Sequence, residues 1–434
     1  MKKIVMLSSV FIFLVLHSFA QSGWSECNVP SAIINVRTDD IFMSDTQIGY
    51  ACSGGYILKT IDGGNNWIPI KVDTMYHRSV EFVNTQKGFV GSFDRYLQGS
   101  NILIKTLDGG STWTDLTPIL DVRARGGICG MAIPDSSTIY GCGNYFQDSA
   151  YIVKSIDGGN TWSFIDMHTY ATSLIDMHFL NKDTGFATGK GPLPLEEAVI
   201  LYTTDGGQSW TYKFQDTLSF SYCWKIQHLT DQIYYASIED WDVSQRGRIL
   251  KSTDGGITWN IQIVPYLVFG QGIQGIGFID SLVGLTGGDI WPTILTVDGG
   301  VSWDTTSICP RVNRVFRVND TLLFASGFGI WKYSPTSTGI QSVSGSITPS
   351  FVLNCYPSPA NKNLTVDINF IHTTHALILL LDNRGRRVKL IENGDKEKGD
   401  YQYQIDTANL PKGIYFVVAK THEDQKSARV IIEH

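Results

Sequence analysis

An eight-residue box recurs six times along this 434-residue chain and restricts its fold more than any other feature. Each copy reads Ser or Thr, any residue, Asp, Gly, Gly, two variable residues and Trp, as in the first copy from Thr60 to Trp67. The aspartates and tryptophans of the six boxes are Asp62, Asp108, Asp157, Asp205, Asp254, Asp298, Trp67, Trp113, Trp162, Trp210, Trp259 and Trp303. Successive box aspartates are 46, 49, 48, 49 and 44 residues apart, a period that predicts one four-stranded propeller blade per repeat.

The residues of the box suit a tight hairpin better than a metal or catalytic site. An Asp at the start of a turn accepts hydrogen bonds from nearby backbone amides, and paired glycines allow positive φ. The Trp supplies a large apolar surface for packing between blades. Because each box has a single carboxylate, we expect the boxes to be structural, and we expect neither a bound metal ion nor a cofactor.

The remaining repeat pattern predicts seven blades, with six or eight as the alternatives. Segments 312–318, 322–326 and 330–333 form a seventh repeat without a box or a fourth strand. The segment Gly23–Val29, with Trp24 in place of a box Trp, is predicted to supply that strand and close the ring. We therefore expect an all-β chain, with a seven-bladed β-propeller at 21–336, a Ser/Thr/Gly linker at 337–350 and a small Ig-like β-sandwich at 351–434.

Residues 1–20 have the pattern of a secretory signal peptide. Lys2 and Lys3 precede an apolar stretch at 4–16, and small residues place the expected cleavage after Ala20. The apolar stretch is shorter than the ~20 residues that span a bilayer, which disfavours a membrane anchor. No other segment is a candidate span, so we expect no membrane span in the mature chain. Losing the two lysines changes the net charge from −7 to −9, which disfavours nucleic acid as a partner.

Two of the seven cysteines fall at comparable places in one predicted hairpin. Centring the hairpin between Asp135 and Ser136 puts Cys129 directly opposite Cys142. One interpretation is a cross-strand disulfide, which an exported protein can form. The other is a pair of small buried thiols.

The connections between the second and third strands of the repeats vary most in length, and they carry aromatic and acidic side chains. Loops on a rigid scaffold usually hold the binding site. Such side chains suit a glycan or a peptide, and the structural alternative is a polar rim with its aromatics packed inward. The predicted binding residues are Tyr96, Tyr145, Glu239, Trp241, Asp242 and Trp291. Asp176 and His178 are candidates for acid–base chemistry, but we expect them to belong to a buried structural network, and no catalytic residue is assigned.

The boxes, together with second strands that begin Gly-Phe-Ala as at Gly185, give the propeller a family resemblance. It resembles the Asp-box (BNR-like) propellers, and among these most closely the photosystem II assembly/stability factors. It is also similar to sialidases, sortilin-type receptors and family 74 xyloglucanases. The resemblance implies the fold and not the activity, because unrelated activities share this scaffold.

Three motifs near the end of the chain carry a second resemblance: Tyr356–Ala360, Asp382–Val388 and Leu410–Tyr415. Together they resemble the type A C-terminal sorting domain of the type IX (Por) secretion system of Bacteroidota, although Ser358 stands where the family has Asn. The resemblance implies that residues 351–434 engage the type IX secretion machinery and are then removed or anchored. The alternative is an ordinary Ig-like binding domain.

These observations together predict a secreted or outer-membrane-surface monomer. We expect its propeller to bind a glycan or a protein ligand without catalysis. The alternative is a glycoside hydrolase acting on extracellular polysaccharide. The propeller lacks the Phe-Arg-Ile-Pro motif of sialidases, and the chain is too short for the second propeller that a family 74 cleft requires. Export argues against a literal role in photosystem assembly.

Overall fold

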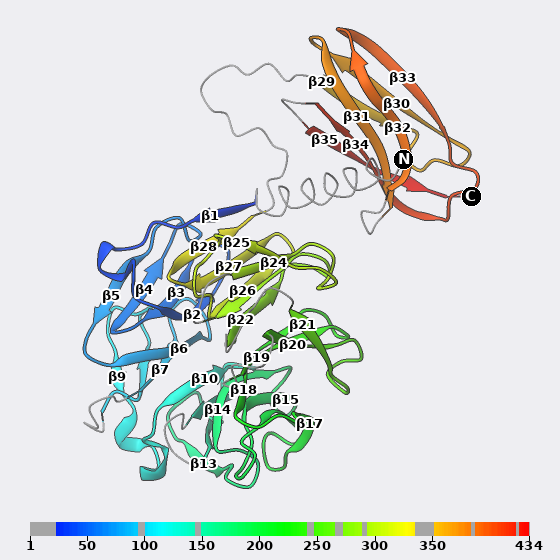
Figure 1. Ribbon diagram of the computed structural model, residues 1–434. Coiled ribbons are helices and arrows are strands. Elements are labelled where there is room, and N and C mark those ends of the chain that lie inside the picture. Colours follow the sequence, from blue (N-terminus) through cyan, green and yellow to red (C-terminus); the bar gives the residue numbers. More distant parts are fainter. Residues whose placement is uncertain are drawn as a thin grey trace. The chain divides into compact units, whose positions relative to one another are not determined.

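The computed structural model describes residues 23–93, 100–143, 149–240, 247–264, 272–288, 293–334, 351–382, 387–421 and 425–433. The chain divides into two compact units, Met1–Pro335 and Thr336–His434. Both are built almost entirely of β-strands (Figure 1).

The described residues of the first unit form seven four-stranded antiparallel sheets, one per predicted blade. The innermost strands of blades one to seven are β2 (Thr38–Met43), β6 (Tyr76–Phe82), β10 (Ile128–Ala132), β14 (Ser173–Phe179), β18 (Ser221–His228), β22 (Ile273–Phe278) and β26 (Arg314–Asn319). The second strands are β3 (Gly49–Ser53), β7 (Gly88–Phe93), β11 (Ile139–Gly143), β15 (Gly185–Lys190), β19 (Tyr234–Asp240), β23 (Gly284–Gly288) and β27 (Leu322–Gly327). The innermost strand of each blade contacts that of the next, and β26 contacts β2, so the ring is closed.

The third and outermost strands complete the blades. The third strands are β4 (Tyr56–Thr60), β8 (Leu103–Thr106), β12 (Tyr151–Ser155), β16 (Ala198–Thr203), β20 (Gly247–Ser252), β24 (Thr293–Thr296) and β28 (Gly329–Tyr333). The outermost strands are β5 (Ile68–Val72), β9 (Thr114–Asp115), β13 (Ser163–Asp166), β17 (Thr211–Gln215), β21 (Asn260–Val264), β25 (Asp304–Thr306) and β1 (Trp24–Glu26). Three short 3-10 helices lie in connections: η1 (Ser31–Ile33), η2 (Thr117–Ile119) and η3 (Val122–Ala124).

Apolar side chains pack between neighbouring blades. Tyr50 of blade one stacks on Phe82 of blade two with ring centroids 3.5 Å apart, and Tyr235 of blade five stacks on Phe278 of blade six at 3.7 Å. One apolar position of every innermost strand is buried, and its seven residues are Ile41, Val80, Met131, Met177, Ile226, Ile276 and Val315. The repeat pattern therefore predicted the blades, and the structure shows which face of each innermost strand is buried.

The seventh blade contains strands from both ends of the first unit. β1 pairs with β28 in antiparallel register, with Trp24 opposite Tyr333 and Glu26 opposite Trp331. The rings of Trp24 and Tyr333 lie 5.2 Å apart. The predicted closure of the ring by the N-terminal segment is thus confirmed.

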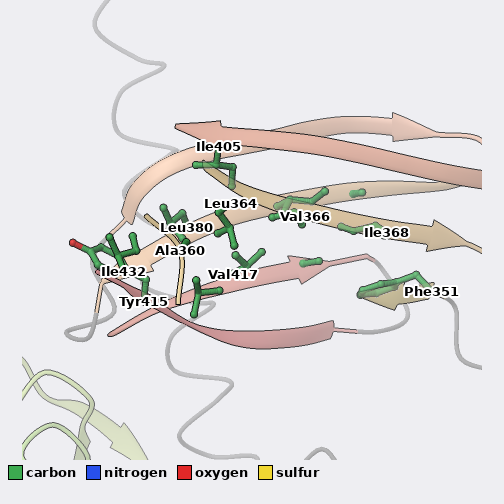
Figure 2. Packing of buried hydrophobic residues seen from close by; sticks show 14 of the residues in the cluster. Phe351, Ala360, Leu364, Val366, Ile368, Leu380, Ile405, Tyr415, Val417 and Ile432 are labelled. Atoms are coloured by element: carbon green, nitrogen blue, oxygen red, sulfur yellow. The ribbon is translucent and has the colours of Figure 1, made fainter. Parts of the chain in front are cut away.

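The second unit is a small sandwich of two antiparallel sheets. One has the order β29 (Phe351–Tyr356), β30 (Asn363–Phe370) and β33 (Gly399–Asp406). The other has the order β32 (Arg387–Lys396), β31 (Thr374–Asp382), β34 (Gly413–Lys420) and β35 (Gln425–Ile432). Figure 2 shows buried side chains of both sheets meeting in one core, among them Val366 and Ile405 from one sheet and Leu380 and Val417 from the other. The predicted small β-sandwich is confirmed.

The motifs of the second unit hold its turns and edges. Tyr415 Oη donates to Pro411 O over 2.8 Å, which fixes the turn before β34. Ser358, at the position that departs from the family pattern, accepts a hydrogen bond from Ile431 N through its Oγ at 3.0 Å. Serine therefore suffices at this position to tie the opening motif to the last strand.

Candidate functional site

The end of the ring that carries the connections from second to third strands, and from each outermost strand to the next blade, is called the loop face. Six binding residues were predicted for this face, and five of them, Tyr96, Tyr145, Trp241, Asp242 and Trp291, lie outside the described residues. Glu239 lies within them.

Glu239 near the end of β19 takes part in a contact between two blades. Its side chain is 8% exposed. Gln274, from the neighbouring blade, donates from Nε2 to Glu239 Oε1 over 2.6 Å. The structure therefore places this predicted binding residue in the blade interface and does not present it to solvent.

The described part of the loop face presents a group of exposed apolar side chains on blade four. Leu193, Leu195 and Phe220 are 63%, 52% and 59% exposed, and Pro194 between the two leucines is exposed as well. They come from two connections, residues 191–197 after β15 and residues 216–220 after β17. Phe220 N donates to Leu195 O over 3.2 Å, which joins the two loops. We call Leu193, Pro194, Leu195 and Phe220 the blade-four platform.

The first platform loop is closed by backbone and charged contacts. Gly191 N donates to Glu197 O at 2.7 Å, and Ser221 N donates to Glu196 O at 3.2 Å. Lys190 Nζ lies 2.7 Å from Glu196 Oε1 and also sits over the ring of Tyr222, 5.0 Å from its centroid. These contacts fix the loop although its leucines face solvent.

The second platform loop starts at a buried ion cluster. Arg248 donates to both carboxylate oxygens of Asp216, at 3.1 and 2.6 Å, and its Nε donates to Asp240 Oδ2 at 2.9 Å. Asp216 also accepts from Thr217 N at 2.8 Å and from Ser221 Oγ at 3.2 Å. Burial opposes the charge of Arg248, but the two carboxylates outweigh it and raise the arginine pKa. The base of the loop is therefore rigid.

Two platform-loop residues have a backbone conformation that non-glycine residues rarely adopt. Glu196 has φ 51° and Phe220 has φ 59°. Each such residue costs on the order of 1–3 kcal/mol, and such strain concentrates at ligand-binding and switch sites. Strained backbone, exposed apolar side chains and a fixed base together mark this part of the loop face as the candidate site. The site was not among the predicted binding residues, and the Leu-Pro-Leu run in a long connection is the sequence signal that indicates it.

Other carboxylates of the loop face within the described residues are held by cations or amides of the protein. Asp39 Oδ1 lies 2.9 Å from Arg37 Nε and also accepts from Arg78. Glu197 Oε1 accepts from Gln215 Nε2 at 2.8 Å. Glu196, Asp216, Glu239 and Asp240 are bonded as described above. All of these carboxylates therefore help to hold the loops and strands of the propeller in place.

The innermost strands place a second charged cluster in the central channel. Asp176 Oδ2 accepts from Arg314 Nη1 at 2.7 Å and from Ile226 N at 3.1 Å. Asp176 Oδ1 lies 3.9 Å from Lys225 Nζ, and Arg314 Nε lies 3.3 Å from Asp40 Oδ1. Asp176 is thus part of a paired network, as the sequence analysis expected.

The six boxes form hydrogen-bonded turns. In the first box, Gly64 N donates to Thr60 Oγ1 (2.9 Å), Asn66 N donates to Asp62 Oδ1 (3.0 Å), and Trp67 Nε1 donates to Gly64 O (3.1 Å). A hydroxyl-to-aspartate contact of 2.8–2.9 Å recurs in all six copies. Hydrogen bonds, chiefly from the Asn66 side chain, lower the pKa of Asp62 to about 2. This geometry favours the structural interpretation of the boxes.

A lysine just before the box links neighbouring blades, and the sequence analysis missed it. The donor and acceptor pairs are Lys59 Nζ to Gly109 O (2.8 Å), Lys154 Nζ to Gly206 O (2.8 Å) and Lys251 Nζ to Gly299 O (3.1 Å). Each ammonium also lies over a tyrosine ring, at 5.4, 5.1 and 5.2 Å respectively. The signal was the recurrence of Lys immediately before the box hydroxyl.

Cys129 and Cys142 are both completely buried and are present as thiols. The predicted register is wrong by one residue, because Gly130 pairs with Cys142 and a β-bulge between Ile128 and Gly130 takes up Cys129. Burial raises the pKa of the Cys142 thiol well above its ordinary value, and Cys129 is the next largest cause. The two side chains therefore still lie near each other.

The described residues contain neither a group of three metal-binding side chains nor a membrane-spanning helix. No three His, Cys, Asp or Glu side chains there gather into a metal-binding group. Among the same residues, no helix has the length and apolar character needed to cross a membrane.

Comparisons with known proteins agree with this architecture. The family described as the secretion system C-terminal sorting domain matches residues 354–433. YCF48 bound to D1 peptide is 15% identical with a TM-score of 0.53, over 72% of this chain and 95% of that chain. YCF48 from Cyanidioschyzon merolae is 16% identical with a TM-score of 0.55, over 73% of this chain and 100% of that chain.

A glycoside hydrolase is similar as well. The GH74 xyloglucanase from Xanthomonas campestris is 11% identical with a TM-score of 0.52, over 94% of this chain and 67% of that chain. At these identities the likeness concerns the fold alone. No curated protein matches the chain by sequence. The chain thus joins a β-propeller with the fold of YCF48 to a type IX secretion system C-terminal sorting domain, and this tail marks it as a secreted or cell-surface protein.

Proposed function

We propose that the propeller is a non-catalytic module that binds a protein ligand through the blade-four platform. The observation that carries the proposal is the exposure of Leu193, Leu195 and Phe220 on two loops that are joined to each other and anchored below. A soluble protein seldom keeps neighbouring large apolar side chains in water unless they serve an interaction. An ordered platform also spares a ligand the entropic cost of fixing the loops.

The chemistry of the platform favours a polypeptide over a glycan. Leucine and proline side chains offer a sugar hydroxyl no hydrogen-bond partner, whereas they match the apolar side chains of a protein segment. A propeller of the same fold, YCF48, has been solved with a peptide bound, which supports this ligand class.

The alternative function is that of a glycoside hydrolase, and the similarity of fold to a xyloglucanase is the observation behind it. That chemistry needs two carboxyl groups free to face a sugar. The loop-face carboxylates named above are instead bonded to arginines, a lysine and glutamines, which favours the binding function.

A peptide array and a glycan array probed with the mature chain test the proposal. Phe220→Asn removes the apolar ring and keeps a residue type that tolerates this backbone conformation. We expect it, and Leu195→Asn, to weaken peptide binding by about tenfold or more. Ile156→Asn is the matched control, since Ile156 is a 71% exposed residue of the third box, and it should bind like the wild type. Binding to glycans alone, turnover of a polysaccharide, or peptide binding that ignores the platform would each overturn the proposal.

We also propose that export uses both ends of the chain. The signal peptide is cleaved after Ala20, and residues 351–434 engage the type IX machinery, for which the sorting-domain match over 354–433 is the support. Deleting 351–434 should leave the protein in the periplasm, whereas the full chain reaches the surface or the medium. N-terminal sequencing of the exported form should begin at Gln21. Normal export of the truncated chain would contradict the proposal.

A further inference from the structure

Two histidines of neighbouring blades face each other at the end of the ring opposite the loop face. His178 is near the end of β14 in blade four, and His228 ends β18 in blade five. Their ring centroids are 5.3 Å apart and the ring planes meet at 43°. Each strand leads directly into the turn to its second strand, which places the pair away from the blade-four platform.

Each of the two rings has a nitrogen atom without a hydrogen-bond partner. The Nε2 atoms of both His178 and His228 are buried and make no hydrogen bond. Buried polar atoms without a partner are rare in native proteins and call for a reason, such as an ion that occupies the site. A neutral imidazole nitrogen is the commonest protein ligand for transition metals.

The separation of the rings fits a shared metal ion. Metal–nitrogen bonds of about 2.0–2.1 Å in a tetrahedral arrangement would hold two imidazole centroids roughly 5 Å apart. Tyr234 stacks on His228 with centroids 4.8 Å apart and holds that ring in place. The side chain of His228 is 26% exposed, which gives an ion a route from solvent.

A carboxylate lies near the pair. Asp231 Oδ1 lies 3.9 Å from His228 Nε2, and the Asp231 side chain is fully exposed.

We propose that His178 and His228 form a two-histidine site for a divalent first-row transition metal, with water completing its coordination. Imidazole ligands select Zn²⁺, Ni²⁺ and Cu²⁺ over Mg²⁺ and Ca²⁺, and Cu²⁺ should bind most tightly. A metal held by two blades links blade four to blade five, so binding stabilises the ring.

The test uses the mature chain purified without a polyhistidine tag. Zn²⁺ at about a hundred times its dissociation constant should raise Tm by about 4 °C, and Mg²⁺ should not. His178→Gln and His228→Gln should each abolish the shift. His168→Gln is the control, because His168 is an exposed histidine paired with Asp166 at 2.9 Å, and it should retain the shift.

A spectroscopic measurement keeps the proposal testable if a variant fails to fold. The electron paramagnetic resonance spectrum of the wild type with one equivalent of Cu²⁺ should show coupling to two imidazole nitrogens. An absent Tm shift with millimolar Zn²⁺ or Cu²⁺, an equal shift in all variants, or a Cu²⁺ spectrum without two nitrogens would overturn it. None of these outcomes bears on peptide binding by the loop face.

Discussion

Arg314 in the seventh blade donates to Asp176 in the fourth blade over 2.7 Å, although the two blades are not neighbours in the ring. The same guanidinium lies 3.3 Å from Asp40 in the first blade. One side chain thus ties three blades together across the central channel.

Replacing this arginine should destabilise the propeller strongly. In Arg314→Leu, Asp40 and Asp176 lose their shared cation while still buried, and breaking a buried pair from one side costs about 3–5 kcal/mol. Urea unfolding followed by tryptophan fluorescence measures the loss. Lys182→Ala, which removes an exposed pair with Asp183, is the control and should change the free energy of unfolding by less than about 1 kcal/mol. Similar costs for the two variants would show that the channel network is not a major support.

Glu81 in the same channel should make stability depend on pH. Burial raises its pKa well above the ordinary value, with further contributions from Asp40 on β2 and Asp176 on β14, while Arg314 on β26 and Lys225 on β18 act in the opposite direction. A carboxyl whose pKa is raised in the folded state binds its proton more tightly there than in the unfolded chain. Its stabilising contribution is complete below the ordinary pKa and is lost as pH rises through the folded value.

Glu81→Gln removes this titration. We therefore expect the variant to gain stability relative to the wild type as pH rises from 5 to 9, with the smallest difference at the acidic end. Urea midpoints measured across this range give the comparison. A constant difference for Glu81→Gln would contradict the assignment.

The fold was predictable because its signals are local and repeated. A box such as Thr60 to Trp67 carries its own turn, with Gly63 and Gly64 at φ 70° and 84°, so each copy reports one blade without knowledge of the others. The missing fourth strand of the seventh repeat likewise pointed to Trp24. A motif that repeats at a fixed spacing can be detected in a single sequence without any knowledge of the structure.

The candidate site was not predictable in the same way. The platform exists because Leu195 meets Phe220, residues of separate connections that touch only after blade four has formed. Whether an apolar side chain is exposed depends on which other segments pack over it in the folded protein. A local sequence pattern does not encode that packing. The register of Cys129 failed for a related reason, since the bulge that takes it up comes from the geometry of the innermost strand.

The lysine before the box should contribute measurable stability. Lys154→Met keeps the aliphatic stem but loses the charged hydrogen bond to Gly206 O, for an expected cost of about 1–2 kcal/mol. Lys213→Met is the matched control, because Lys213 also lies over a tyrosine ring, that of Tyr202 at 4.9 Å. Equal losses of unfolding free energy in the two variants would assign the effect to the ring contact and not to the link between blades.

Cys129 and Cys142 are thiols in the structure, and we predict that they become linked by a disulfide in the exported chain. Both are buried in one hairpin, and an oxidising compartment permits the bond before the hairpin is sealed. Peptide mapping of exported protein, alkylated under denaturing conditions without reduction, should find the two cysteines linked. Cys223, a buried thiol of blade five, should be alkylated in the same sample. Full alkylation of Cys129 and Cys142 would show that they remain thiols.

Closure of the ring by β1 should decide whether the propeller stays soluble. Deleting residues 21–29 leaves the outer edge of β28 without its partner and removes Trp24 from Tyr333. An unpaired edge strand recruits other chains, so we expect a lower Tm and aggregation that increases with protein concentration. A synthetic peptide of residues 21–29 added in excess should restore the Tm by strand addition, because the register of β1 is fixed by its contacts with β28. The same peptide with Trp24→Ser should restore less, since it lacks the ring that packs on Tyr333. A truncated chain as stable and monomeric as the intact one would mean that three blade strands suffice to close the seventh sheet.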